Sequence, residues 1–413
     1  MVLRVDSDRM RADFEALAEI GSVPDGGIER TTFSDAHLAA RAWFHDRARD
    51  AGLETRVDSA ANHSAVLPAR DPGARTLLIG SHLDSVRRGG RYDGALGVIS
   101  ALEVVRVAKD ADLDLPVALE AIDFTDEEGT LVGTLGSCAL AGQLSPELLA
   151  APRGGREILV TELERMGLNE AGMRAARRDP VTLAGYLELH IEQGPVLERA
   201  GTKIGIVTGI TGASSFRVVF DGDARHAGTT PMDARRDAAV GAAAFVLGVR
   251  ETVTRAFHGC VATVGDIATE PGSFNVVPGR AKLRLECRSL DAAELDALEQ
   301  ALIGRAHEVA EEFGLDVTVE RVGRWEPSPT DTSVRAAFAT AAVALGLSTL
   351  ELPSGAGHDA QPLAAITPSG MVFVPSVGGI SHDPSEHTAW EDCVNGANVL
   401  LGAAVQLAHA VPA

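Results

Sequence analysis

The sequence predicts an α/β protein in which a mixed sheet carries a second, smaller α+β domain as an insertion. Strand-like and helix-like stretches alternate near both ends of the chain, which is typical of a largely parallel sheet covered by helices. A block in the middle instead has the order β-α-β-β-α-β, the split pattern of ferredoxin-like domains. A chain of 413 residues is long enough for two domains. We expect one domain over residues 1–212 and 326–413 and an inserted domain over residues 213–325.

The first domain is expected to contain short apolar strands and long helices. Strands are predicted at TLLIG (76–80), PVALEAIDFTDEE (116–128) and MVFVPS (371–376), and helices at residues 94–110 and about 389–409. Open α/β sheets usually bind ligands beyond the carboxyl ends of their strands. Polar residues that follow these strands are therefore the first candidates for function.

The inserted block has a different order of predicted strands and helices. Asp291 is a plausible N-cap for the second helix of this block. The predicted strands are residues 214–224, 260–270, 281–290 and 315–325, and the predicted helices are residues 233–257 and 291–314.

The composition excludes several classes of partner. Lys and Arg number 37 against 58 Asp and Glu, so the net charge is −21. So acidic a chain is repelled by nucleic-acid phosphates and by anionic membranes. The four cysteines form no C-x-x-C pair, and neither an apolar leader nor an apolar run of about 18 residues occurs. We expect a cytoplasmic protein without a nucleic-acid or membrane partner.

Acidic and histidine residues recur where predicted strands end or glycine-rich loops begin. Each one alone is more often a structural or solvent-exposed residue, but their repetition suggests that the ends converge. Imidazole nitrogen and carboxylate oxygen are ligands that suit Zn²⁺, Mn²⁺, Co²⁺ or Ni²⁺. The stretches are SHLD with His82 and Asp84, RYDG with Asp93, TDEEG with Glu127 and Glu128, LHIE with His190, and ISHDP with His382.

The chemistry of such a set suggests a role for each member. Two neighbouring divalent ions need a bridging carboxylate, and Asp93 is the natural candidate. Adjacent glutamates on an extended strand point in opposite directions, so one of Glu127 and Glu128 can bind metal while the other acts as a base. Asp84 lies on the same side of an extended chain as His82 and could orient its imidazole. A divalent ion lowers the pKa of bound water, which makes hydrolysis the expected reaction class.

These motifs resemble the M20 family of metal-dependent amidohydrolases and peptidases, and most closely its carbamoylase branch. That branch comprises N-carbamoyl-L-amino acid hydrolases, allantoate amidohydrolases and β-ureidopropionases. The resemblance covers nearly the whole chain. It rests on GSHLDSVRRGGRYDGALGV, DFTDEEGT, LELHIEQGPVLE, RHAGTTPMDARRDA, SFNVVPG and GGISHDPSEHT.

The resemblance implies a dinuclear centre with two divalent ions per subunit, whose identity among Zn²⁺, Mn²⁺, Co²⁺ and Ni²⁺ stays open. Asp93 would bridge the two ions. One ion would be bound by His82 and His190, and the other by Glu128 and His382. Glu127 would then be the general base.

The resemblance also implies that the inserted domain is a lid and a dimerisation domain, and that the protein is a homodimer. His226 would reach over the centre, often from the partner subunit, and stabilise the developing oxyanion. Asn275 and Arg288 would hold the substrate carboxylate, and Gln193 and His358 would be further substrate contacts. From the residues alone, a loop histidine is an equally good interpretation of His226, whereas a turn asparagine and a surface-strand arginine are the preferred interpretations of Asn275 and Arg288.

The implied activity is metal-dependent hydrolysis of a linear amide C–N bond in a small anionic substrate, either an N-carbamoyl (ureido) amino acid or an allantoate-like carboxylate. One alternative is an N-acyl amino acid deacylase or dipeptidase of the same fold, which His190 disfavours because many M20 peptidases have a carboxylate there. Another is a metal- or ligand-binding protein without catalysis. Two departures from the family stand out: Leu131 and Val132 replace a basic and an aromatic residue, and Cys287 replaces an aspartate.

Overall fold

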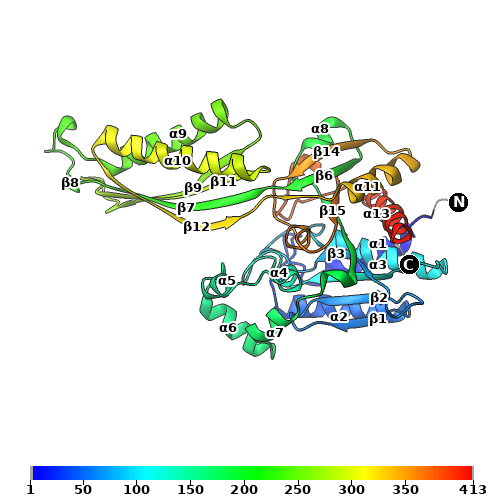
Figure 1. Cartoon of the computed structure of the whole chain (residues 1–413). Coiled ribbons are helices and arrows are strands. Elements are labelled where there is room, and N and C mark those ends of the chain that lie inside the picture. The colour runs from blue at the N-terminus through cyan, green and yellow to red at the C-terminus, as the bar shows by residue number, and fades with distance from the viewer. Residues whose placement is uncertain (1–2, 412–413) are drawn as a thin grey trace. The chain divides into compact units, whose positions relative to one another are not determined.

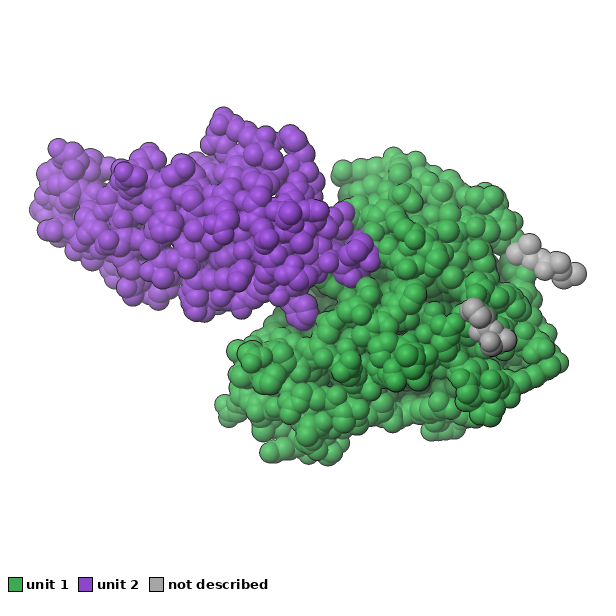
Figure 2. Space-filling view, in the orientation of Figure 1, with its two compact units in different colours: residues 1–208, 330–413 green, residues 209–329 purple. Residues whose placement is uncertain are grey.

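The computed structural model describes residues 3–411, and the chain divides into two compact units (Figures 1 and 2). Unit 1 comprises Met1–Thr208 and Thr330–Ala413, and unit 2 comprises Gly209–Pro329. The candidate metal ligands all belong to unit 1. His226, Asn275 and Arg288 belong to unit 2.

Unit 1 is built on a mixed sheet with the strand order β1-β2-β4-β3-β5-β15-β6-β13, and β14 also pairs with β6. The central strands β4, β3, β5 and β15 run parallel to one another, whereas β1, β2 and β6 form antiparallel pairs at the sides. The bounds are β1 (Glu54–Val57), β2 (His63–Leu67), β3 (Thr76–His82), β4 (Ala118–Phe124), β5 (Leu183–Ile191), β6 (Ile204–Ile210), β13 (Ser328–Pro329), β14 (Thr349–Ser354) and β15 (Ser369–Val374).

One group of helices shares the main hydrophobic core with this sheet. Helix α3 packs on β3, β4 and β5, and α13 packs on α3, α11, β5 and β15 (Figure 1). Residues of α1 and α2 enter the same core. These helices are α1 (Ser7–Glu19), α2 (Asp35–Asp50), α3 (Ala95–Asp110), α11 (Thr332–Ala344) and α13 (Trp390–Ala410).

A second, smaller core lies under the helices that follow β4. Leu131 and Val132 are buried in it, beside residues of α4, α6 and α7. Apolar packing therefore accounts for the first departure from the family pattern. The elements that follow β4 are α4 (Leu135–Ala141), α5 (Pro146–Ala150), α6 (Arg156–Arg165), α7 (Glu170–Ala175) and η1 (Pro180–Thr182). The remaining short helices of unit 1 are α8 (Val196–Ala200), α12 (Ala360–Leu363) and η3 (Val377–Gly379).

Unit 2 has a four-stranded antiparallel sheet in the order β12-β7-β11-β9, with α9 and α10 packed together on one face. Its chain order, β7-α9-β9-β11-α10-β12, follows the split pattern that the sequence predicts. Asp291 caps α10 by accepting from the Glu294 amide at 2.8 Å, as predicted. The bounds are β7 (Gly212–Asp221), β8 (Arg225–His226), η2 (Met232–Ala234), α9 (Ala238–Ala256), β9 (Val261–Glu270), β10 (Val276–Val277), β11 (Arg280–Ser289), α10 (Ala292–Phe313) and β12 (Asp316–Trp325).

Two further expectations concern cysteines and membrane helices. All four cysteines are free thiols buried in the protein, so the described chain has no disulfide framework. Among residues 3–411, no helix has both the length and the apolar character needed to cross a membrane.

Candidate metal centre

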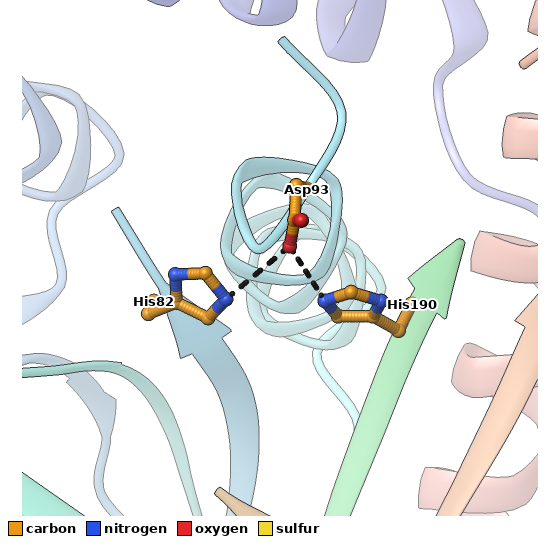
Figure 3. Close-up of side chains that lie close together, drawn as sticks. All are labelled: His82, Asp93 and His190. Atoms are coloured by element: carbon orange, nitrogen blue, oxygen red, sulfur yellow. Dashed lines mark ion pairs between the residues drawn. The ribbon is translucent and has the colours of Figure 1, made fainter. Parts of the chain in front are cut away.

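The centre of the site is the carboxylate of Asp93, which three histidines approach. Its Oδ1 lies 3.1 Å from Nε2 of His190 and 3.5 Å from Nε2 of His82, and its Oδ2 lies 3.2 Å from Nε2 of His382. Figure 3 shows the imidazoles of His82 and His190 pointing at Asp93 from opposite sides. The structure therefore brings these residues together, as the sequence predicts.

The parallel sheet explains why the histidines meet. His82 ends β3, and His190 lies near the end of β5, the neighbouring parallel strand. Asp93 comes just before α3, and Gly94 between them has a φ of 62°. A Cβ at Gly94 would lie 2.4 Å from the His82 ring, so glycine is needed both for the backbone conformation and for the close approach.

Each buried histidine has its other ring nitrogen occupied by a backbone carbonyl. His82 Nδ1 lies 3.0 Å from the Asp84 carbonyl, and His190 Nδ1 lies 2.9 Å from the Ile191 carbonyl. A carbonyl can only accept, so Nδ1 carries a hydrogen in both rings, and Nε2 is the nitrogen that faces Asp93. Both imidazoles are thus oriented as metal ligands require.

Glu386 holds the loop that carries Asp93. One oxygen of its buried carboxylate accepts from the backbone amides of Tyr92 and Asp93 at 2.9 and 3.1 Å, and the other accepts from the Ser381 hydroxyl at 2.9 Å. The loop before α3 is thereby tied to the loop with His382. Sequence reasoning missed Glu386, although it lies within the SHDPSEH motif.

Glu127 and Glu128 do not lie on a strand, and that expectation is wrong. Strand β4 ends at Phe124, and Asp126, with a φ of 58°, turns the chain. The Asp126 carboxylate accepts from the backbone amides of residues 131, 132 and 133 at 2.6–3.0 Å, which closes a tight loop. Loop geometry, rather than strand alternation, separates the two glutamates.

The two glutamates nevertheless face different histidines. Glu127 Oε2 lies 3.6 Å from Nε2 of His82, whereas Glu128 Oε2 lies 3.5 Å from Nε2 of His382. Glu128 also accepts from the Val86 amide at 3.3 Å. Each glutamate therefore sits beside a different group of candidate ligands.

Asp84 acts on the glutamate loop more directly than on His82. Its carboxylate accepts from the amides of Glu127 and Glu128, both at 3.2 Å, and lies 3.7 Å from Nδ1 of His82. The 3.0 Å contact with that imidazole comes from the Asp84 backbone carbonyl instead. The carboxylate that the sequence assigns to orienting His82 thus ties the end of β3 to the loop after β4.

The residue between His82 and Asp84 is held by two buried charged side chains. The Leu83 amide donates to Asp123 at 2.8 Å, and its carbonyl accepts from Arg30 Nε at 2.9 Å. Asp123 is paired in turn with Arg41 at 2.8 Å. Both arginines are 1% exposed, so they form a rigid support beneath the site.

The electrostatics show an excess of negative charge. Burial alone would lower the pKa of His82, but Glu127, Asp93 and Asp84 outweigh it and hold that pKa well above its usual value. Burial would raise the pKa of Asp93, yet contacts with His190, His382 and His82 hold it well below the usual range. The histidines and the carboxylate stabilise each other's charged forms.

The pKa values of Glu127 and Glu128 are raised, whereas that of Asp93 is lowered. Burial raises the pKa of Glu127 well above its usual value, and Glu128 adds to this against the effect of His82. Burial also raises the pKa of Glu128 to about 7, and repulsion from Asp93 contributes. A cation placed among these carboxylates would relieve their repulsion.

The donor atoms fit divalent cations. Ligand atoms of His82, Asp93 and His190 lie within 4.8 Å of one another, and so do those of Asp93, Glu128 and His382. Both groups contain only imidazole nitrogen and carboxylate oxygen, and they share Asp93. The residues present are therefore suited to hold two ions through one common carboxylate.

Two residues predicted to contact substrate lie in this part of unit 1. Gln193 donates from its side-chain amide to Asp93 Oδ2 at 2.8 Å, so it lies beside the shared carboxylate. His358 is buried, and its ring packs edge-on against that of His190 with centroids 4.6 Å apart. Burial, reinforced by His190, holds the pKa of His358 well below its usual value, so this imidazole is neutral.

Two of the unit 2 residues lie together. His226 of β8 is paired with Val276 of β10, and the Asn275 carbonyl accepts from the Ala227 amide at 2.8 Å. The Asn275 side chain accepts from the Ser273 hydroxyl, and the His226 ring accepts from the Gly228 amide. Both side chains are exposed in the described chain.

Arg288 lies at the opposite end of the unit 2 sheet. In β11, Arg288 is paired with Ala213 of β7 and with Val261 of β9. Arg280 lies at the other end of β11, which follows β10, and is paired with Asp221 of β7. Eight residue steps along the strand separate the two arginines, a distance of about 26 Å. Arg288 forms an ion pair with Glu286 at 2.6 Å. Within a single unit 2, His226 and Asn275 therefore cannot reach a substrate that Arg288 holds.

Cys287 has a packing explanation. Its side chain is fully buried in the core between the unit 2 sheet and its helices. Burial raises the pKa of this thiol to about 12, so it is neutral. A buried thiol avoids the desolvation cost that an aspartate would have there.

Comparisons with known proteins identify the family of this chain. The model of Peptidase family M20/M25/M40 matches residues 78–406. The chain belongs to the M20 family. An N-carbamoyl-L-amino acid amidohydrolase of Geobacillus stearothermophilus is 38% identical over 98% of this chain and 99% of its own length. An allantoate deiminase of Arabidopsis thaliana is 35% identical over 91% of this chain and 78% of its own length.

A solved structure agrees over the full length of this M20 chain. It is an amidase of the hydantoinase/carbamoylase family from Burkholderia multivorans, with a TM-score of 0.90 and 34% identity over 100% of both chains. The resemblance that the sequence motifs suggest is confirmed.

Proposed function

We propose that this M20 chain is a hydrolase of a linear, non-peptide C–N bond in an N-carbamoyl (ureido) amino acid, and that it uses two divalent ions. The observation that carries this proposal is the Asp93 carboxylate. It lies between His82 and His190 on one side and His382 and Glu128 on the other. Such a pair of sites suits hydrolysis, because two ions that share a carboxylate can act on one water molecule.

Each residue would have a distinct role. His82 and His190 would hold one ion, Glu128 and His382 the other, and Asp93 would contact both. When bound, the ions would supply Lewis-acid activation of the attacking water. Glu127 would accept the proton of that water and pass it to the leaving nitrogen, because its carboxylate faces His82 without being needed as a ligand.

The substrate class is supported by the relatives. The Geobacillus protein carries the name of an N-carbamoyl-L-amino acid amidohydrolase, and the Arabidopsis protein that of an allantoate deiminase. The substrates in both names are small carboxylates with a ureido group. In this proposal Arg288, Asn275, Gln193 and His358 would contact the substrate.

We further propose that unit 2 is a lid through which two chains form a dimer. Its support is the distance of about 26 Å along β11 between Arg288 and the end of the sheet near His226 and Asn275. If all three act on one substrate, His226 and Asn275 must come from a second copy. His226 would then stabilise the oxyanion in the site of its partner.

A substrate screen tests the reaction class. N-carbamoyl-L-amino acids, N-carbamoyl-β-alanine, allantoate and ureidoglycolate would be compared with N-acetyl amino acids and dipeptides, by measuring amine or ammonia release. We expect turnover of ureido compounds, its loss after chelation, and its return with Mn²⁺, Zn²⁺, Co²⁺ or Ni²⁺. Undiminished activity in chelated protein would contradict the metal role. Faster cleavage of acetyl compounds or dipeptides would instead indicate a deacylase or dipeptidase.

Glu127→Gln tests the general base. The amide cannot accept the proton, so kcat should fall by about 10²–10⁴-fold. The metal content, measured by elemental analysis, should stay at that of the wild-type chain. Loss of an ion together with activity would reassign Glu127 as a ligand.

Mixing two inactive variants tests the shared site. A dimer of one Glu127→Gln chain and one His226→Ala chain would contain one intact site, so refolded equal mixtures should recover about a quarter of wild-type activity. Each variant carried alone through the same refolding is the control. No recovery, with mixed dimers verified by mass spectrometry, would show that each chain completes its own site.

A further inference from the structure

Behind the candidate ligands lies a buried glutamate that the proposed reaction does not use. Strand β5 presents Leu187, Leu189 and Ile191 to the main hydrophobic core. The alternating residues Glu188 and His190 face the other side of the sheet. Glu188 is fully buried, two residues before a proposed metal ligand.

Both oxygens of Glu188 are occupied, and their partners come from two other segments. Oε1 accepts from the Ser81 hydroxyl at 2.8 Å, and Ser81 precedes His82 on β3. Oε2 accepts from the Ala360 amide at 3.2 Å, two residues after His358. One carboxylate thus connects the segments that carry His82, His190 and His358.

A metal ligand is an alternative role for Glu188. Its carboxylate, His190 and His358 have donor atoms within 4.8 Å of one another. Yet both of its oxygens already accept hydrogen bonds, and His358 Nε2 lies 2.8 Å from the Ser354 hydroxyl. His190 Nε2 faces Asp93. Since both Glu188 oxygens and Nε2 of His190 are already engaged, the contacts favour a structural clamp over a third ion site.

We propose that Glu188 is a positioning residue, whose two hydrogen bonds hold β3, β5 and the start of α12 in the arrangement that the metal centre requires. This inference rests on the metal centre of the proposed function. Residues that hold metal ligands in place without binding the metal typically change metal affinity by 10–100-fold when they are lost. A glutamine can preserve the clamp, because its oxygen can accept from Ala360 while its amide donates to the Ser81 hydroxyl.

Co²⁺ binding tests the clamp without any substrate. Chelated wild-type protein and the variants Glu188→Ala, Glu188→Gln and Ser81→Ala would be titrated with Co²⁺ against a competing chelator and followed by visible absorption. We expect two ions in the wild-type chain and at least tenfold weaker binding of one of them in Glu188→Ala. Glu188→Gln should stay within about threefold of wild type, because the clamp is kept. Ser81→Ala removes one hydrogen bond and no charge, so its Co²⁺ affinity should lie between those of Glu188→Ala and Glu188→Gln.

Glu120→Gln is the matched control. Glu120 is likewise buried on a central strand, accepts from the Ser64 hydroxyl at 2.6 Å and pairs with Arg178, but it contacts none of the candidate ligands. Thermal unfolding of the metal-free proteins would show how much each substitution destabilises the fold. Glu120→Gln should lower stability while leaving Co²⁺ affinity unchanged.

The outcomes separate this inference from the proposed function. Wild-type Co²⁺ affinity in folded Glu188→Ala and Ser81→Ala would overturn the clamp, as would equal losses in Glu188→Ala and Glu188→Gln. A third ion that disappears in Glu188→Ala would make Glu188 a ligand. A wild-type chain that binds no Co²⁺ would overturn the metal centre itself and the clamp with it.

Discussion

The organisation of the site depends on the contacts of one carboxylate with three imidazoles. Asp93 meets His82, His190 and His382 at 3.1–3.5 Å, and these histidines are separated along the chain by 108 and 192 residues. The contact is possible because β3 and β5 are parallel neighbours and because Gly94 lets the start of α3 approach the His82 ring. Displacing this carboxylate would separate both groups of candidate ligands at once.

Around this contact, the protein uses buried carboxylates to hold backbone in place. Asp84 accepts from the amides of Glu127 and Glu128, Asp126 from those of residues 131–133, and Glu386 from those of Tyr92 and Asp93. Hydrogen bonds with an ionised acceptor are stronger than neutral ones, which suits loops that must not move. The same carboxylates add negative charge, which Arg30 and Arg41 offset only in part. A loop architecture of this kind is best matched to a cation at its centre.

Much of the fold could be predicted from local patterns. The predicted strands at residues 76–80 and 371–376 correspond to β3 and β15, the predicted helix at residues 94–110 corresponds to α3, and the β-α-β-β-α-β order of unit 2 follows from alternation and spacing. The residues around Asp93 could be found because acids and histidines recur at strand ends. Glu386 and Glu188 could not, because their partners lie far away in the sequence. The sequence prediction extends β4 to residue 128 instead of Phe124, because the turn at Asp126 depends on backbone amides five to seven residues later.

Anomalous X-ray diffraction from crystals grown with Mn²⁺ would show whether two divalent ions share Asp93. We expect two anomalous peaks per chain, each within bonding distance of a different Asp93 oxygen, one beside His82 and His190 and the other beside Glu128 and His382. A single peak, or two peaks of which one does not contact Asp93, would contradict this expectation.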